Sequence, residues 1–597
     1  MTAKTQTQPL APGNRVDFNA ALVPPDGYAL AAAIGTTFSM DFPTALTVPV
    51  ALALRGAMER DEITASPLAA LAAMQRLREK VMICVEAGSI HASKGPQSPL
   101  VALIEDMVVG IQPPVRGSFH PKIWFLRFEP TEDAGEPIRQ RLIIMSRNLT
   151  RDRSWDAGLV LDGIEKAETS DQNPALVAFL DWLLPAAKRL RAPFSGLRDG
   201  LPKVLWDKVP GIGKPYFHAH FPKQSKDQLW RPGKYARLAV ISPFCDAAGL
   251  KRLGGKGPER LVACDDWLAK LGDQRPQVCQ VLNGSLLPEA DDENIPDPEA
   301  RSGLHAKLFI RERDDKTFIT LGSGNATGAG LNGTNVEVFA TLSGKTEVIG
   351  GIDQMLGDQG LGPLLEDWTL RKVTDAELAA DRFDERVRDA RRALVEAGPT
   401  LEFHADGTVY HATLDFAQAL KWPDGPMGLK ARLVTTSGAK DVKPGAPSNL
   451  GTLKKAQITT FIEFTLIGET ADETAAFVTS AASTTVPPYD ERLEALLADV
   501  VDAPDKVLRF LTAMLEDRPD LDSLIGGWGG GAAGGRGAGA NAALPPVLET
   551  LLAAYLAGRD KDIRELDALI SKMPQSEGKD MNDFKALWAA FREVIKP

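Results

Sequence analysis

Two His-x-Lys pairs are the residues of this chain best suited to chemistry. His120 and Lys122 stand in the sequence Ser-Phe-His-Pro-Lys, and His305 and Lys307 stand in Leu-His-Ala-Lys. Residues two apart on a β-strand share a face, so each pair is expected to present an imidazole and an ammonium group on one side of a strand. An imidazole can attack or donate a proton, and an ammonium group can stabilise negative charge. Each pair therefore suits chemistry at a phosphate.

Each pair is followed by a Ser-x-Asn motif on what we expect to be the next strand. Ser146 and Asn148 follow the first pair, and Ser323 and Asn325 follow the second. A lone His-x-Lys is usually a surface histidine beside a solvated lysine. Two copies with the same sequel, about 185 residues apart, indicate a duplicated unit instead. We expect the serine and asparagine side chains to face the same phosphate as the histidine and the lysine.

These paired motifs resemble those of the phospholipase D superfamily, over roughly residues 25–370. The resemblance implies that each half supplies His, Lys and Asn to one site between two similar halves. It implies a phosphohistidine intermediate formed by one histidine, with His120 as nucleophile and His305 as general acid, or the reverse. It also implies that the enzyme needs no metal ion and no other cofactor.

The sequence departs from the commonest pattern of that superfamily, in which an aspartate follows the histidine by seven positions. Arg127 stands there in the first motif and Glu312 in the second. The tyrosyl-DNA phosphodiesterase branch also lacks this aspartate and keeps His, Lys and Asn. The departure therefore favours a nuclease over a lipase.

Members of the superfamily also carry a carboxylate, past the Ser-x-Asn strand, that orients a catalytic histidine. Aligning the segments that follow the two Ser-x-Asn motifs places Asp156 opposite Glu337. The resemblance implies that these two acids hold the histidine tautomers by hydrogen bonds. The alternative is that two surface carboxylates coincide in a short alignment.

The charge around the first motif differs from that of the whole chain. The formal net charge is −11, which argues against a surface coated with positive charge for indiscriminate binding of nucleic acid. Residues 116–155, however, contain eight Lys and Arg against five Asp and Glu. We expect Arg147 and Arg151 in this segment to bind the backbone of a nucleic-acid substrate. Trp124, Phe125 and Trp155 belong either to the core or to a surface that stacks on bases.

The elements that must position these motifs are alternating strands and helices. Strands are expected at Phe119–Phe128 and Arg141–Ser146 in the first copy, and at Leu304–Arg311 and Thr317–Gly322 in the second. This order predicts an α/β fold with two duplicated, layered α/β/α halves of the phospholipase D type. A helix is expected at Ala376–Ala397, and a β-rich domain and a C-terminal helical region are expected beyond it.

The predicted division of the chain follows composition and periodicity. It consists of an N-terminal tail (1–24), a first half (25–200), a second half (201–370), a helical connector (371–399), a β-rich domain (400–487), a helical segment (488–525), a Gly-rich linker (526–542) and a C-terminal helical region (543–597). The β-rich and C-terminal helical regions are candidate surfaces for protein partners.

Other classes of site and location are not favoured. The four cysteines lack metal-ligand or disulfide spacing, so reduced buried thiols are expected. His218 and His220 lack partners at zinc-ligand spacing, and Ser323 does not stand in a nucleophile elbow. The longest apolar tract, Met40–Leu54, is interrupted by prolines and is too short to cross a membrane, and the start of the chain lacks a secretory pattern. A cytoplasmic protein is expected.

The predicted function is therefore a metal-independent phosphodiesterase, most consistent with a nuclease for DNA or RNA. At the level of the superfamily, such a protein suits bacterial restriction or anti-phage defence. One alternative is a phospholipid phosphodiesterase or transferase, although no basic amphipathic helix stands out for reaching a bilayer. Another is a non-catalytic scaffold within a multiprotein complex, against which the intact duplicated motifs argue.

Overall fold

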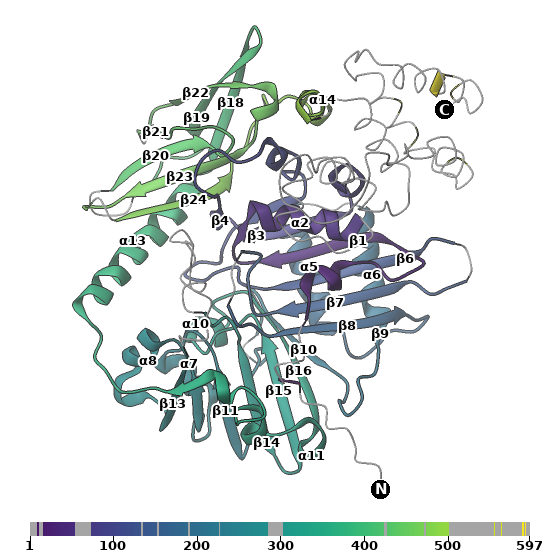
Figure 1. Ribbon diagram of the computed structural model, residues 1–597, viewed down its shortest axis with the longest axis vertical. Helices are drawn as coiled ribbons and strands as arrows, with labels where there is room; N and C mark the ends of the chain where they lie inside the picture. The colour runs from purple at the N-terminus through teal and green to yellow at the C-terminus, as the bar shows by residue number, and fades with distance from the viewer. Residues whose placement is uncertain are drawn as a thin grey trace, which may run out of the picture.

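Two mixed β-sheets with helices packed against them form the centre of the protein, as a computed structural model shows (Figure 1). The structure describes residues 9–10, 16–53, 73–132, 135–151, 154–188, 192–225, 227–283, 303–422, 427–443, 445–470 and 473–500, with a few isolated residues beyond 500. The predicted α/β fold class is confirmed.

The first sheet comes from the first half of the predicted repeat. In order across the sheet its strands are β5 (Val108–Ile111), β3 (Val81–Glu86), β1 (Tyr28–Thr37), β6 (Ile123–Pro130), β7 (Arg139–Met145), β8 (Gly158–Glu165) and β9 (Val204–Trp206). Strands β1, β3 and β5 are parallel, and β6 to β9 continue the sheet in antiparallel pairs. Every residue of β3 is buried, as expected for a parallel strand covered on both faces.

The second sheet is built the same way. In order across the sheet its strands are β10 (Tyr216–His220), β16 (Glu337–Lys345), β15 (Lys316–Gly322), β14 (Leu308–Arg313), β11 (Arg237–Ile241), β12 (Arg260–Val262), β13 (Val278–Leu282) and β17 (Leu365–Asp367). Strand for strand, β13, β12, β11, β14, β15 and β16 repeat the order and directions of β5, β3, β1, β6, β7 and β8. The predicted duplication therefore extends to the topology.

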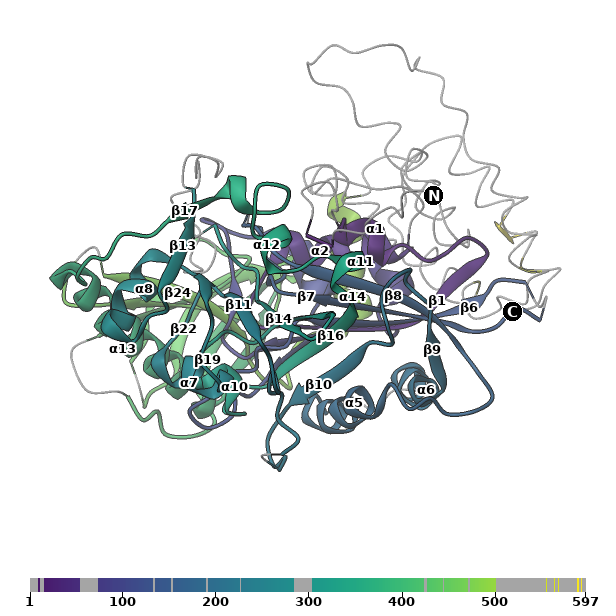
Figure 2. The same ribbon diagram turned by 90° about the horizontal axis from the view of Figure 1, so that it is seen from below.

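Helices cover both faces of the first sheet (Figure 2). Helices α1 (Phe18–Leu22) and α2 (Phe42–Ala53) lie on one face, and α5 (Pro174–Ala186) and α6 (Ala192–Gly200) lie on the other. The apolar cluster under α5 and α6 continues without interruption into buried residues of β14, β15 and β16. One core thus joins the two halves and fixes their relative position.

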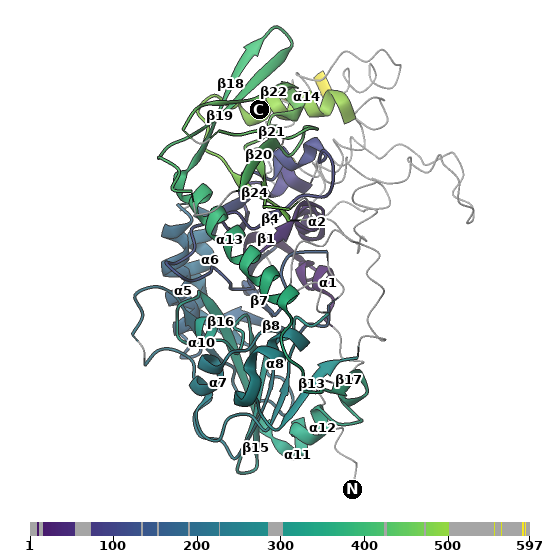
Figure 3. The same ribbon diagram turned by 90° about the vertical axis from the view of Figure 1, so that its left-hand side faces the viewer.

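A long helix, α13 (Asp375–Ala397), leaves the second half and leads to the β-rich region (Figure 3). It begins with a capping box between Thr374 and Glu377 and ends at Gly398, whose φ of 65° suits a glycine beyond a helix end. Two side chains of the helix pair with the regions beside it. Asp381 accepts from Lys270 of the second half at 2.9 Å, and Arg386 donates to Glu473 of the β-rich region at 3.2 Å.

Strands between residues 399 and 480 form the β-rich region. Strands β18 (Pro399–Asp406), β19 (Val409–Phe416) and β22 (Ser448–Lys454) make one sheet; β20 (Gly428–Leu433), β21 (Lys440–Asp441), β23 (Phe461–Ile467) and β24 (Thr474–Ser480) make another. The second of these sheets also contains β2 (Met40–Asp41) and β4 (Ile90–His91) of the first half. Its backbone pairing therefore continues into the part of the chain that carries the first His-x-Lys motif.

The predicted boundaries beyond the β-rich region remain predictions. Helix α14 (Tyr489–Val500) opens the segment 488–525, while the rest of that segment and the Gly-rich linker 526–542 lie outside the described residues, as does nearly all of 543–597. Within the described part of the chain, no helix combines the length and apolar character that crossing a membrane requires.

Candidate active site

Each His-x-Lys pair lies in an extended segment just before a strand, not within the strand as the sequence predicted. Strand β6 begins at Ile123 and β14 begins at Leu308. The reason is that the segments before these strands pair with the opposite half: Phe119 forms a parallel bridge to Val336, and Leu304 forms one to Trp155.

The two halves exchange these backbone hydrogen bonds reciprocally. The amide of His120 donates to the carbonyl of Val336 at 3.0 Å, and the amide of His305 donates to the carbonyl of Trp155 at 2.8 Å. Each histidine is therefore placed by the half to which it does not belong. This reciprocity brings the two motifs to one interface, as a site shared between the halves requires.

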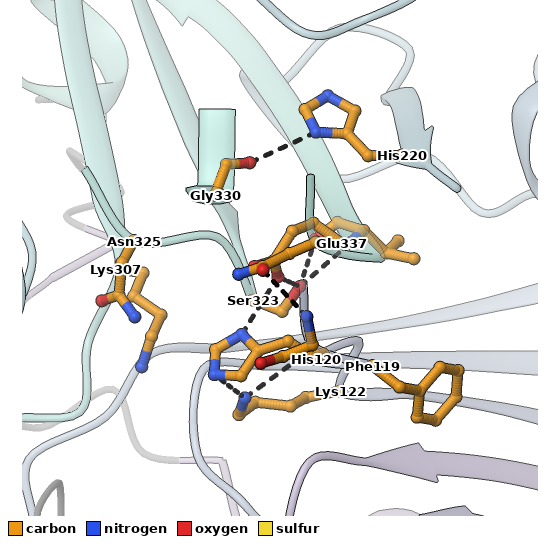
Figure 4. Close-up of polar contacts among 12 residues, drawn as sticks. Phe119, His120, Lys122, His220, Lys307, Ser323, Asn325, Gly330 and Glu337 are labelled. Carbon is orange, nitrogen blue, oxygen red and sulfur yellow. Dashed lines mark hydrogen bonds and ion pairs between the residues drawn. The ribbon is translucent and has the colours of Figure 1, made fainter. Parts of the chain in front are cut away.

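Both lysines are buried, which is rare for this residue type. Lys122 is 1% exposed, and its Nζ lies 2.9 Å from His120 Nε2, so the structure brings this His-x-Lys pair together (Figure 4). Lys307 is 0% exposed, and its Nζ donates to the carbonyl of His305 at 2.9 Å and, across the interface, to that of Ser146 at 3.2 Å. Two ammonium groups thus lie in a region screened from water.

The serine side chains of the Ser-x-Asn motifs form hydrogen bonds with main-chain groups. The Ser146 hydroxyl accepts from the amide of Ala157 at 2.7 Å and donates to its carbonyl at 3.2 Å. The Ser323 hydroxyl accepts from the amide of Val338 at 3.0 Å and also donates to Glu337. These bonds tie the ends of β7 and β15 to the strands that follow, so both serines support the site through the main chain.

The asparagines are buried and are placed by hydroxyl groups that sequence reasoning missed. The hydroxyl of Thr37 accepts from the amide that follows Asn148 at 3.0 Å, and that of Ser242 accepts from the amide that follows Asn325 at 2.9 Å. Ser242 also donates to the carboxamide oxygen of Asn325 at 3.2 Å, which leaves the amide nitrogen of that side chain as its donor end. Thr37 is the last residue of β1 and Ser242 directly follows the equivalent strand β11, so the equivalence of these two strands was the signal for both hydroxyl groups.

Glu337 meets His120 across the interface. Its Oε2 lies 3.1 Å from Nδ1 of the imidazole, and its Oε1 accepts from Asn335 at 3.1 Å. Burial raises the pKa of Glu337, but the charge and hydrogen bond of His120, together with Lys122 and Ser323, outweigh burial and hold that pKa below its usual value. A charged carboxylate at Nδ1 leaves Nε2 of His120 as the nitrogen that faces Lys122.

The other residues predicted around the site are divided between partly or fully exposed positions and the core. The Asp156 side chain is 32% exposed, and its carboxylate is 3.8 Å from Arg147. The exposed Arg151 donates its amide to the carboxylate of Asp41. Trp124 and Phe125 on β6 are core residues, each 1% exposed, which decides between the two alternatives for them.

Two further residues beside His120 were not predicted. Glu86, at the end of β3, is buried, and it accepts from the amide of Phe119 at 2.7 Å. Burial raises the pKa of Glu86, while Arg391, the Phe119 amide and His120 act in the opposite direction. The partly exposed ring of Phe38 lies 5.3 Å from the imidazole of His120 and 5.9 Å from Nζ of Lys122. The sequence offered one signal for Glu86: it is a charged residue at the end of an otherwise apolar strand.

His220 of β10 is held by backbone groups on both ring nitrogens. Nε2 of His220 accepts from the amide of Trp230 at 2.8 Å, and Nδ1 donates to the carbonyl of Gly330 at 3.3 Å (Figure 4). Burial lowers the pKa of His220 to about 4. Among the residues that the structure describes, no three His, Cys, Asp or Glu side chains are grouped to hold a metal ion.

Comparison with known proteins found no matching family model and no match among curated proteins. Among solved structures, a mutant of the tyrosyl-DNA phosphodiesterase of yeast matches with a TM-score of 0.31 at 10% identity, over 56% of this chain and 88% of that one. A polyphosphate kinase from Porphyromonas gingivalis matches with a TM-score of 0.29 at 14% identity, over 55% of this chain and 43% of that one.

Proposed function

We propose that the protein is a phosphodiesterase that cleaves the backbone of DNA or RNA without a metal ion, through a phosphohistidine on His120. One observation carries this proposal: two His-Lys-Asn sets, one from each half, are buried at an interface where each half places the histidine of the other. Such a set combines a nucleophile, a proton donor and cationic donors for an anionic transition state.

In the first step, the lone pair of Nε2 of His120 attacks phosphorus. The bond from phosphorus to the leaving oxygen breaks, its electron pair goes to that oxygen, and the oxygen takes a proton from the imidazolium of His305. The products are a phosphohistidine that keeps one ester bond and a free alcohol. Lys122, Lys307, Asn148 and Asn325 stabilise the non-bridging oxygens in this step.

In the second step, water attacks phosphorus and gives its proton to the now neutral His305. The bond between phosphorus and Nε2 of His120 breaks, and its electron pair returns to nitrogen. A phosphate monoester leaves, and both histidines regain their starting protonation states. Glu337 supports His120 throughout, because a carboxylate at Nδ1 stabilises the positive charge that the ring carries in the intermediate.

The surroundings of His120 favour a nucleic acid over a lipid. The partly exposed ring of Phe38 offers a face for a nucleobase, while Arg147 and Arg151 lie at the rim, where they can contact phosphates. The cations Lys122, Lys307 and Arg391 outnumber the buried carboxylates Glu337 and Glu86, which also favours an anionic substrate.

The test is cleavage in EDTA of labelled single-stranded DNA, duplex DNA, RNA and phosphatidylcholine. We expect nucleic acid to be cut by the wild type, activity to be lost in His120→Ala, and activity to be kept in His404→Ala, a matched change at an exposed position of β18. Cleavage of phosphatidylcholine alone would establish the lipid alternative. Unchanged cleavage by His120→Ala would overturn the proposal. Failure of the wild type to cleave any of the four substrates would also overturn it.

The same proposal extends to restriction or anti-phage defence in a bacterial host. Expression of the wild type should lower the plating efficiency of a sensitive phage, and His120→Ala should restore it. Equal plating with both proteins, across phages with unrelated genomes, would contradict a defence role while leaving the chemistry intact.

A further inference from the structure

The main chain that leads to His120 is held from two directions. From the second half, Asn335 accepts from the amide of Ser118 at 3.0 Å, and the main chain of Val336 bonds Ser118 and His120. From the other direction, Glu86 accepts from the amide of Phe119 at 2.7 Å, and Arg392 of α13 donates to the carbonyl of Gly117. Four successive residues are therefore fixed by side chains or backbone from other elements.

Two neighbouring arginines of α13 act on this segment. The guanidinium of Arg392 donates to the carbonyl of Gly117 at 3.0 Å. Its neighbour Arg391 lies 3.3 Å from the Glu86 carboxylate. The two carboxylate oxygens of Glu86 are thus divided between Arg391 and the amide of Phe119. Adjacent residues of one helix reach the segment before His120, one directly and one through Glu86.

Arg391 also borders the aromatic ring that contacts His120. Its guanidinium carbon lies 5.9 Å from the centroid of Phe38, which is itself 5.3 Å from the imidazole. The helix packs closely here: a Cβ at Gly88 would lie 2.9 Å from side-chain atoms of Arg391 and Val395, so only glycine fits. Close packing of this kind restricts where the Arg391 side chain can go.

Helix α13 is held at other points along its length as well. Asp381 pairs with Lys270 of the second half, and Arg386 pairs with Glu473 of the β-rich region. A helix held along its length presents its last turns at a defined position. Its arginines can therefore fix the segment before His120 more firmly than side chains on a loop could.

We propose that Arg391 and Arg392 are positioning residues for His120, so that the connector helix, outside the two repeated halves, completes the support of the active site. The inference rests on the proposed function, in which His120 attacks phosphorus. An error of about 1 Å in the placement of a reacting group can cost about 100-fold in rate. The arginines act on the rate through the main chain and Glu86, and not by contact with substrate.

The first test is kinetic and uses the full chain in EDTA with bis(p-nitrophenyl) phosphate, a substrate too small to reach distant binding surfaces. We expect Arg391→Gln and Arg392→Gln each to lower kcat about tenfold and to change KM less than twofold. Arg391→Lys should recover much of the loss, because a lysine keeps the charge beside Glu86. Arg388→Gln, on the exposed side of the same helix, should behave as the wild type.

The second test does not depend on catalysis. The chain has seven histidines, so ring signals of histidine-labelled protein can be assigned with single variants such as His120→Ala. Arg391→Gln and Arg392→Gln should shift the ring signals of His120 and leave those of the exposed His404 and His411 in place. If Arg391→Gln does not fold, the same signals are read in Arg391→Lys and in the Glu86→Gln/Arg391→Gln pair, which removes both charges together.

The outcomes separate the two proposals. Unchanged kcat and unchanged His120 signals in both glutamine variants would overturn the positioning role. A wild type that cleaves no phosphodiester would overturn the proposed function, while the His120 signals would still decide whether the arginines place this ring. A rise in KM with kcat unchanged would mean that the arginines bind substrate, and it too would overturn positioning.

Discussion

The two half-sites share what orders the backbone and differ in what surrounds the imidazole. In both, a hydroxyl at the end of the first strand holds the amide that follows the asparagine, and the histidine amide bonds the opposite half. From the paired registers of the strands, Thr37 corresponds to Ser242, and both hydroxyls donate to a carbonyl two residues later at 2.6 Å. The two halves have therefore preserved the same hydrogen bonds to the backbone at equivalent positions.

The differences lie around the histidine rings. The same registers place Pro243 where the first half has Phe38, and Cys264 where it has Glu86. The carboxylates at the equivalent positions 337 and 156 differ as well: Glu337 is fully buried and contacts His120, whereas the Asp156 side chain is one-third exposed.

Helix α13 adds its arginines to the first half-site, at Glu86 and Gly117. A ring enclosed by a carboxylate, an aromatic face and a braced main chain suits a covalent intermediate, which must be held through two steps. We propose that the ring of His305, which has Pro243 and Cys264 at the positions of Phe38 and Glu86, serves as proton donor and acceptor. The asymmetry of the structure thus matches an asymmetric division of labour.

The largest effect should come from substituting the two histidines one at a time. His120→Asn should lower kcat by about 10⁴-fold and form no covalent intermediate. His305→Asn should slow both steps by about 10³-fold and leave an acid-labile, alkali-stable phosphate label on His120, because the intermediate loses the base that activates water. The label is measured by peptide mapping after rapid quenching with labelled oligonucleotide. A label on His305 in the His120→Asn protein would reverse the assignment.

Substituting Glu337 and the equivalent Asp156 should give a smaller and unequal pair of effects. Glu337→Gln should lower kcat about 100-fold, since the buried imidazolium loses its partner, and Asp156→Asn should lower it less than tenfold. The pKa of Glu337 lies below its usual 4.5, so this group stays ionised, and its contribution is lost only as the pH falls through that lowered value. Rates of the wild type and both variants from pH 4.5 to 8 check this, because the ratio of wild-type to Glu337→Gln rates should stay constant over that range. Equal losses would show that the half-sites are equivalent.

Local signals in the sequence predicted several elements closely. The connector helix was expected at residues 376–397 and spans Asp375–Ala397, because its capping box and the glycine after it are encoded within a few residues of each end. The duplication was readable from the two motif pairs. The addition of β2 and β4 to the sheet of the β-rich region was not, because that pairing joins positions more than 300 residues apart, as between Ile90 and Val478.

In the candidate site, too, local motifs were predicted and contacts between distant segments were not. The two predicted His-x-Lys motifs lie at one interface, whereas the strand expected to contain each motif was predicted to begin too early. Pro121 lacks an amide hydrogen, and the segment around it pairs with the other half instead of continuing β6. Phe38 and Arg391 meet His120 only through tertiary packing, and neither stands in a motif that could have announced it.

The smallest effect should come from the aromatic face, and it bears on the substrate more than on the chemistry. If Phe38 stacks on a base, Phe38→Leu should raise KM about tenfold for a single-stranded oligonucleotide, with kcat little changed, and Phe38→Tyr should restore it. An otherwise identical oligonucleotide with abasic residues next to the cleaved bond should show the same KM with leucine and phenylalanine. Pro243→Ala, the matched change in the second half, should leave both substrates unaffected. Because the abasic substrate keeps every phosphate, an equal loss on both oligonucleotides would place Phe38 among the supports of His120 and not among the contacts to substrate.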